Sequence, residues 1–172
     1  MRPTHPLYTG MPTTIFEVMS RLAIEHKAVN LGQGFPDVDG PQEVRQVAAH
    51  ALLAGPNQYP PMMGLPALRK AVADSENRFF GIERQAANVL ITSGATEALS
   101  DCLMALIEPG DEVVVFDPCY DCYVPLIERA GGTPKLIALE PPHRSFTHEA
   151  LDAVFPDRTQ AILFNNPLHP AS

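Results

Sequence analysis

The tetrapeptide SGAT at residues 93–96 combines the residue types that can hold an anion. It follows a short apolar run at residues 89–92 and precedes apolar residues with helical spacing, so it lies where a strand gives way to a helix. Small residues let a ligand approach the backbone, and the first amides of a helix have no partner inside it. With the helix dipole, these amides favour a bound phosphate. A capped turn without a ligand has the same pattern, and these residues alone leave both interpretations open.

Two ring-bearing side chains follow other apolar runs. Tyr120 comes after residues 112–116, where a flat ring can stack on a flat ligand or pack into the core. His169 comes after residues 160–164, and its imidazole can donate a hydrogen bond. Cys119 and Cys122 have CxxC spacing, but neither a redox-type context nor further metal ligands accompany them. We therefore expect reduced thiols and no metal site.

The composition is that of a globular protein. The chain has 172 residues, of which 45% are apolar and 19% charged, and its net charge is -8. This charge disfavours nucleic acid or an anionic membrane as a partner, because no basic run can neutralise phosphates. No apolar stretch reaches the ~20 residues that cross a bilayer, and the N-terminus lacks the apolar core of a signal peptide. We expect a cytoplasmic protein.

Hydrophobic spacing predicts an α/β chain that begins with helices. Prolines make residues 1–14 an extended arm, and the periodicity predicts helices over residues 15–28, 42–53 and 66–80. Short β-branched runs predict strands at 89–92, 112–116, 135–139 and 160–164, with helical patterns between them. Because these strands are apolar on both faces, they indicate a largely parallel sheet covered by helices. The boundary between the helical part and the α/β part is expected near residue 85.

Four motifs in this order resemble those of the class I/II aminotransferases with the type I pyridoxal-phosphate (PLP) fold, especially the kynurenine/glutamine and methionine aminotransferase branch. They are LGQGFPD at residues 31–37, QYPPMMGL at 58–65, TSGATEA at 92–98 and NNPLHP at 165–170. The resemblance implies an incomplete large domain with a mixed, mostly parallel sheet and helices on both faces. It divides the chain into an N-terminal arm, helix and substrate loop (1–40), a helical segment (41–85) and the first part of the PLP-binding α/β domain (86–172).

The resemblance also implies a role for particular residues. The phosphate of PLP would be held by Gly94, Ala95 and Thr96, and the pyridine ring would stack on Tyr120. Tyr59 would reach the cofactor phosphate of a partner subunit, which implies a homodimer with shared active sites. The backbone of Gly34 would contact the substrate carboxylate. His169 stands where the family has an asparagine that bonds the cofactor's 3-oxygen and supports the substrate carboxylate; unlike asparagine, histidine changes its charge within the physiological pH range.

The activity that this resemblance implies is transamination between an amino acid, of aromatic, methionine or glutamine type, and a 2-oxo acid. The chain has no catalytic lysine in the family's context, since Lys27, Lys70 and Lys135 all have ordinary surroundings. The aspartate that pairs with the pyridine nitrogen and the arginine that clamps the substrate carboxylate are also absent. We therefore expect the chain to be the N-terminal part of such an enzyme and to be inactive by itself.

Two alternative functions are also compatible with these motifs. One is a C–S β-lyase of the same fold, and the other is a non-catalytic module, either a truncated remnant or a ligand-sensing regulator domain. In the family's sheet only the runs at 112–116 and 135–139 would pair directly here. Because unpaired edges with apolar faces promote aggregation, we expect a polypeptide of these residues alone to be poorly soluble or partly ordered.

Overall fold

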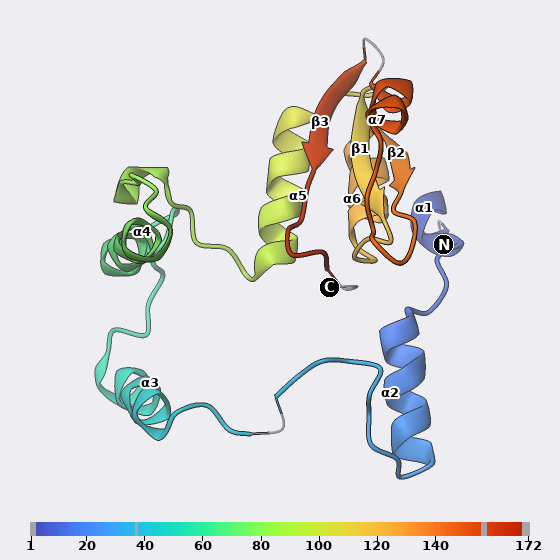
Figure 1. The fold of residues 1–172 in the computed structure, drawn as a ribbon. Helices are drawn as coiled ribbons and strands as arrows, with labels where there is room; N and C mark the ends of the chain where they lie inside the picture. The colour runs from blue at the N-terminus through green and yellow to red at the C-terminus, as the bar shows by residue number, and fades with distance from the viewer. Residues whose placement is uncertain (1–2, 37, 156–157, 170–172) are drawn as a thin grey trace. The chain divides into compact units, whose positions relative to one another are not determined.

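The computed structural model describes residues 3–36, 38–155 and 158–169. The chain divides by its internal contacts into two compact units, one made of Thr13–Thr92 and the other of Met1–Pro12 with Ser93–Ser172. Figure 1 shows the course of the chain through its helices and strands. The first unit is helical, and the second unit contains a three-stranded sheet with its helices. Within the described residues, no helix is long and apolar enough to cross a membrane.

The sheet is parallel and is built around its first strand. It contains β1 (Glu112–Asp117), β2 (Thr133–Ala138) and β3 (Thr159–Leu163) in the order β2-β1-β3. Both neighbours of β1 run parallel to it. All three predicted strands are confirmed to within two residues at each end, and a mostly parallel α/β sheet is what the sequence predicted.

The expectation that only the first two of these strands pair directly was wrong. β3 hydrogen-bonds the second edge of β1, with Val114 opposite Ile162 and Val115 opposite Leu163. The physical reason is the burial of β1, because its four residues from Val113 to Phe116 are all buried. A strand enclosed on both faces is a central strand, and its backbone groups need partners on both edges.

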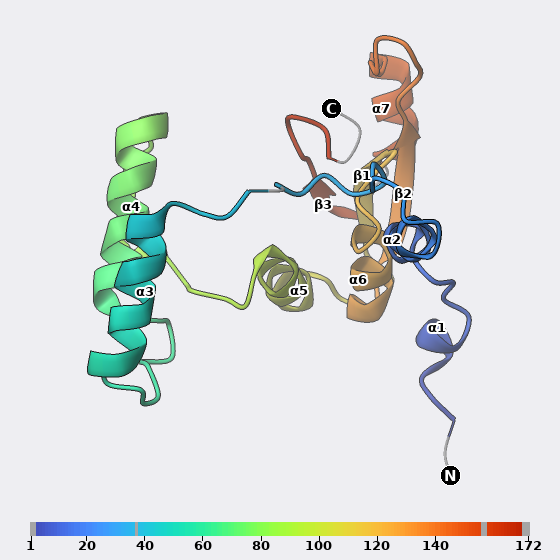
Figure 2. The ribbon, with the colours of Figure 1, turned by 90° about the horizontal axis from the view of Figure 1, so that it is seen from below.

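Alternate residues of β1 serve two separate hydrophobic clusters. Val113 and Val115 belong to a cluster with residues of α5 (Ala95–Leu106) and α6 (Tyr123–Ala130). Val114 and Phe116 belong to a second cluster, against which α7 (His148–Val154) packs. Figure 2 shows α5 and α6 on one side of the sheet and α7 on the other. Helices therefore cover both faces, as predicted.

Residues 89–92, predicted as a strand, do not join a sheet within the described residues. A short helical turn, Ala86–Asn88, precedes them. The amide of Ile91 donates to the carbonyl of Met63 at 3.1 Å, and the Arg69 guanidinium donates to the carbonyl of Val89 at 2.8 Å. β-Branched residues favour a strand only where a partner edge is available. Here a loop carbonyl and an arginine supply the partners instead.

The helical unit follows its sequence signals closely. α4 spans Pro66–Phe80 as predicted, because proline suits the first turn and Gly81, at φ 66°, ends the helix. α3 spans Gln42–Ala54, one residue longer than predicted. α2 spans Ile15–Glu25 rather than continuing to residue 28, because the chain turns through Lys27 at φ 50°.

The predicted extended arm contains a short helix. α1 spans Pro6–Thr9, with proline in its first turn, and the His5 ring accepts a hydrogen bond from the Leu7 amide at 3.3 Å. The helix contacts α6 of the sheet-containing unit. The expectation of an extended arm was therefore wrong. A proline that follows a helix-capping residue, as Pro6 follows His5, can start a helical turn even in a proline-rich segment.

A polypeptide of these 172 residues is expected to self-associate. β3 is an edge strand of the described sheet; Ile162 within it is 48% exposed, and Phe164 directly after it is 63% exposed. Light scattering after size exclusion should show oligomers, and Ile162→Lys should reduce them because a charge on an edge opposes strand pairing. A monodisperse wild-type polypeptide with a sharp, cooperative melt would contradict this expectation.

Candidate functional site

The predicted phosphate loop forms the start of α5. Gly94 is the residue before the helix, with φ 87° and ψ 174°, and no side chain caps the helix there. This backbone conformation is essentially restricted to glycine. A Cβ atom added at Gly94 would meet no atom within 4 Å, so open space lies over the loop. The Glu97 carboxylate accepts a hydrogen bond from the Ser93 amide, which braces the turn from the other side.

Tyr120 and His169 meet face to face. Their ring centroids are 4.7 Å apart and their planes differ by 27°, a stacked arrangement. Tyr120 follows β1 and His169 follows β3, and the carboxyl ends of parallel strands lie at one edge of a sheet. Tyr123, at the start of α6, contacts Tyr120 edge to face at 5.9 Å. The sequence placed both rings at this edge, but it did not predict that they touch.

Thr96 of the predicted phosphate loop and Cys122 of the Tyr120 loop lie close enough for the threonine side chain to lower the pKa of the thiol, against the larger effect of burial. Thr96 lies in the first turn of α5, and Cys122 is the residue before α6. Ala95 also shares a cavity of about 520 Å³ with Asn165 of the NNPLHP motif. The structure thus brings Gly94–Thr96, Tyr120 and His169 to the same end of the sheet, within one compact unit.

The two cysteines beside Tyr120 are held in the protonated form. Burial raises the pKa of the Cys119 thiol, and Asp117 and Cys122 raise it further. Burial also raises the pKa of the Cys122 thiol, which the Thr96 hydrogen bond partly opposes. A thiol with a raised pKa is a poor nucleophile and a poor metal ligand. Among the described residues, no group of three His, Cys, Asp or Glu side chains is placed to hold a metal ion.

Tyr59 and Gly34 belong to the helical unit. The Tyr59 side chain is 98% exposed, so its ring and hydroxyl are open to an external contact. Gly34 has no atom within 4 Å of an added Cβ position, so its backbone is also accessible. Both roles that the resemblance implied stay predictions. Asp37 and Pro170, which end two of the motifs, lie outside the described residues.

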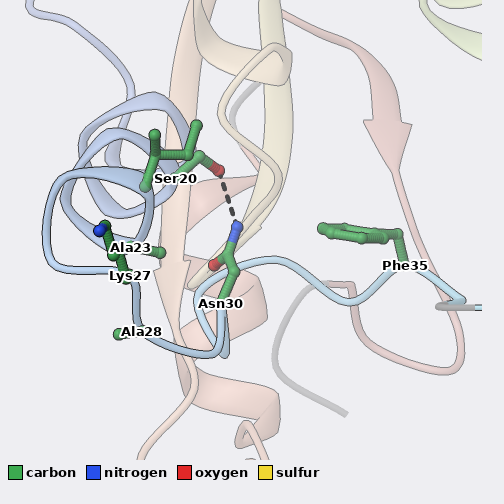
Figure 3. Close-up of a pocket in the computed structure, with 7 residues that line it drawn as sticks. Ser20, Ala23, Lys27, Ala28, Asn30 and Phe35 are labelled. Carbon is green, nitrogen blue, oxygen red and sulfur yellow. Dashed lines mark hydrogen bonds between the residues drawn. The ribbon is translucent and has the colours of Figure 1, made fainter.

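Sequence reasoning missed a polar cluster in the helical unit. Ser20 and Asn30 line a cavity of about 560 Å³ together with Lys27 and Phe35, and a hydrogen bond joins the first two (Figure 3). Ser20 lies on α2, and Asn30 directly precedes the LGQGFPD loop. The available signal was a lone asparagine between Val29 and Leu31.

The arrangement suits a flat, phosphorylated ligand such as PLP at two points. Gly94 leaves room at a helix start, where backbone amides and the helix dipole attract a phosphate. Tyr120, in the loop that follows β1, is an aromatic side chain of the kind on which a flat ligand ring can stack. His169 does not fit this arrangement in the same way, because its ring already lies against the ring of Tyr120.

Replacing Gly94 with alanine should lower the free energy of unfolding by about 1–3 kcal/mol, because its φ of 87° is strained for any residue with a Cβ. Gly10→Ala is the matched control, since Gly10 has φ -97° and equal open space, and it should change stability by less than about 0.5 kcal/mol. Denaturant unfolding measures both. Equal effects of the two substitutions would contradict the strain at Gly94.

Comparison with known proteins places these features in a family. Residues 26–171 match the family described as aminotransferase class I and II. Methionine aminotransferase of Escherichia coli K12 is 45% identical over 161 residues, which cover 93% of this chain and 42% of that protein. Kynurenine–oxoglutarate transaminase 1 of Homo sapiens is 37% identical over 164 residues, which cover 87% of this chain and 39% of that protein.

Solved structures agree. The Escherichia coli protein YbdL, whose structure and reactivity identify a methionine aminotransferase function, matches with a TM-score of 0.92 at 43% identity. That match covers 99% of this chain and 44% of YbdL. N-Succinyldiaminopimelate aminotransferase from Mycobacterium tuberculosis matches with a TM-score of 0.90 at 41% identity, over 98% of this chain and 44% of that one. The chain thus spans less than half the length of these relatives, and it belongs to the aminotransferase class I and II family.

Proposed function

We propose that this chain is part of a PLP-dependent aminotransferase that moves an amino group between an amino acid and a 2-oxo acid. The family depends on PLP. The observation that supports the proposal is the open backbone of Gly94 at the start of α5, in the same compact unit as the stacked rings of Tyr120 and His169. A helix start can attract a phosphate, and the carboxyl end of a parallel sheet is where such sheets bind ligands. The donor would be of aromatic, methionine or glutamine type; a methionine aminotransferase and a kynurenine–oxoglutarate transaminase among the relatives support the methionine and aromatic types.

PLP supplies the electron sink that transamination needs. The residues of this chain would bind and orient it. The amides of residues 94–96 would hold the phosphate through the positive end of α5. Tyr120 would pack against the ring, and its edge contact with Tyr123 restricts its freedom before a ligand binds. Gly34 would present a backbone amide to the substrate carboxylate.

Tyr59 extends the proposal to a dimer. Its side chain is almost fully exposed, although a tyrosine ring gains from burial. Contact between the Tyr59 hydroxyl and the cofactor phosphate of a second subunit would bury this ring and complete the phosphate site. The protein would then be a homodimer with shared active sites.

The test uses the full protein that contains this chain. It is expected to bind PLP with a change in absorbance and to transfer amino groups from methionine, phenylalanine or glutamine to a 2-oxo acid. Tyr120→Ala should weaken PLP binding roughly 2- to 10-fold, the equivalent of one aromatic pair, whereas Tyr120→Phe should keep it. Absence of PLP binding by the wild-type protein would refute the proposal.

His169→Asn should strengthen PLP binding, roughly 2- to 10-fold, because it removes the ring that stacks on Tyr120 and restores the amide seen in the family. Fluorescence titration with PLP measures the dissociation constant, and His169→Ala separates the loss of the ring from the gain of the amide. Weaker binding by both variants would show that the His169 ring itself holds the cofactor.

A further inference from the structure

The loop that follows α2 folds back and is tied to the helix by three side chains. Asn30 donates from Nδ2 to the Ser20 hydroxyl at 3.0 Å, and Ser20 donates in turn to Oε1 of Gln33 at 3.3 Å. Oδ1 of Asn30 accepts from the Gly32 amide at 3.0 Å. Asn30 therefore uses both ends of its side chain, one on the helix and one on the loop backbone.

A steric restraint acts at the same place. A Cβ atom added at Gly32 would lie 2.5 Å from Cβ of Met19, which precedes Ser20 on α2. Real Cβ atoms do not approach so closely, so the loop backbone lies directly against the helix and only glycine fits. The close approach and the hydrogen bonds are independent observations that fix the same segment.

The network ends at the turn that carries Gly34. The Phe35 amide donates to the carbonyl of Gln33 at 3.2 Å, which makes Gly34 the central residue of a three-residue turn. The Gln33 side chain is bonded to Ser20, so the residue before Gly34 is held to the helix. Figure 3 shows Asn30 and Ser20 joined on one side of the cavity and Phe35 on the other.

We propose that Asn30 and Ser20 are positioning residues for the substrate: they hold the Gln33–Gly34 turn so that the Gly34 backbone meets the substrate carboxylate. This rests on the proposed transaminase function. Neither side chain touches the reacting atoms. Their contribution is to remove freedom from the turn before the substrate arrives, which lowers the entropy cost of binding.

The test separates substrate positioning from simple stability in the full protein. Asn30→Asp keeps the acceptor for Gly32 but loses the donor to Ser20. It should raise KM for the amino donor roughly 5- to 10-fold, the effect of one lost hydrogen bond, with little change in kcat or in the PLP absorbance. Ser20→Ala should raise KM in the same way, whereas Ser20→Thr should keep KM near the wild-type value because threonine retains the hydroxyl.

Asn77→Asp is the matched control. Asn77 also bonds through both ends of its side chain, to the carbonyl of Arg84 at 3.1 Å and to the amide of Arg84 at 2.7 Å, in the same helical unit. The Asn77→Asp variant should lower Tm as Asn30→Asp does, but it should leave the KM for the amino donor unchanged. Equal KM effects of the two variants, or unchanged KM in both Asn30→Asp and Ser20→Ala, would overturn the positioning role.

Hydrogen exchange distinguishes a failure of this inference from a failure of the proposed function. Asn30→Ala removes the acceptor of the Gly32 amide, so this amide should exchange faster whether or not the protein transaminates. Faster exchange with an inactive wild-type protein would refute the transaminase and, with it, the role in substrate binding. Unchanged exchange in an active protein would refute the network alone.

Discussion

The double-sided burial of β1 is the constraint on which the sheet-containing unit depends. Four consecutive apolar side chains on this strand are enclosed, so water cannot satisfy its backbone, and both of its edges are paired. The parallel direction of β1 and β3 then places the segments that follow them at one edge. Tyr120 and His169 meet because of this geometry, and the helix start at residues 94–96 lies in the same compact unit.

The parts that sequence reasoning predicted best are those with strong local signals. Pro66 and Gly81 mark the ends of α4, and apolar runs mark β1, β2 and β3. The helix start at residues 93–96 was predicted from small residues between an apolar run and a helical pattern, and it does begin α5, whereas its phosphate binding stays a prediction. These features depend on residues close together in the chain, so a single sequence contains the information.

The parts that were wrong or missed depend on partners distant in the chain. Residues 89–92 have strand-forming side chains, but the described sheet offers them no edge, and Arg69 bonds Val89 instead. The pairing of β3 with β1 required the strand order, which local pattern does not contain. The stack of His169 on Tyr120 and the bonds of Asn30 depend on side-chain directions, which only the folded chain defines.

The alternation of side chains along β1 has a consequence for how this unit can vary. The cluster beneath α5 and α6 and the cluster beneath α7 share the main chain of one strand, but each uses its own side chains. A change of volume on one face therefore meets the side chains of its own cluster first and reaches the other cluster through the shared strand. Substitutions beneath α7 leave the side chains that pack around Tyr120 and Tyr123 in place, and Leu168 is where the α7 side comes next to His169.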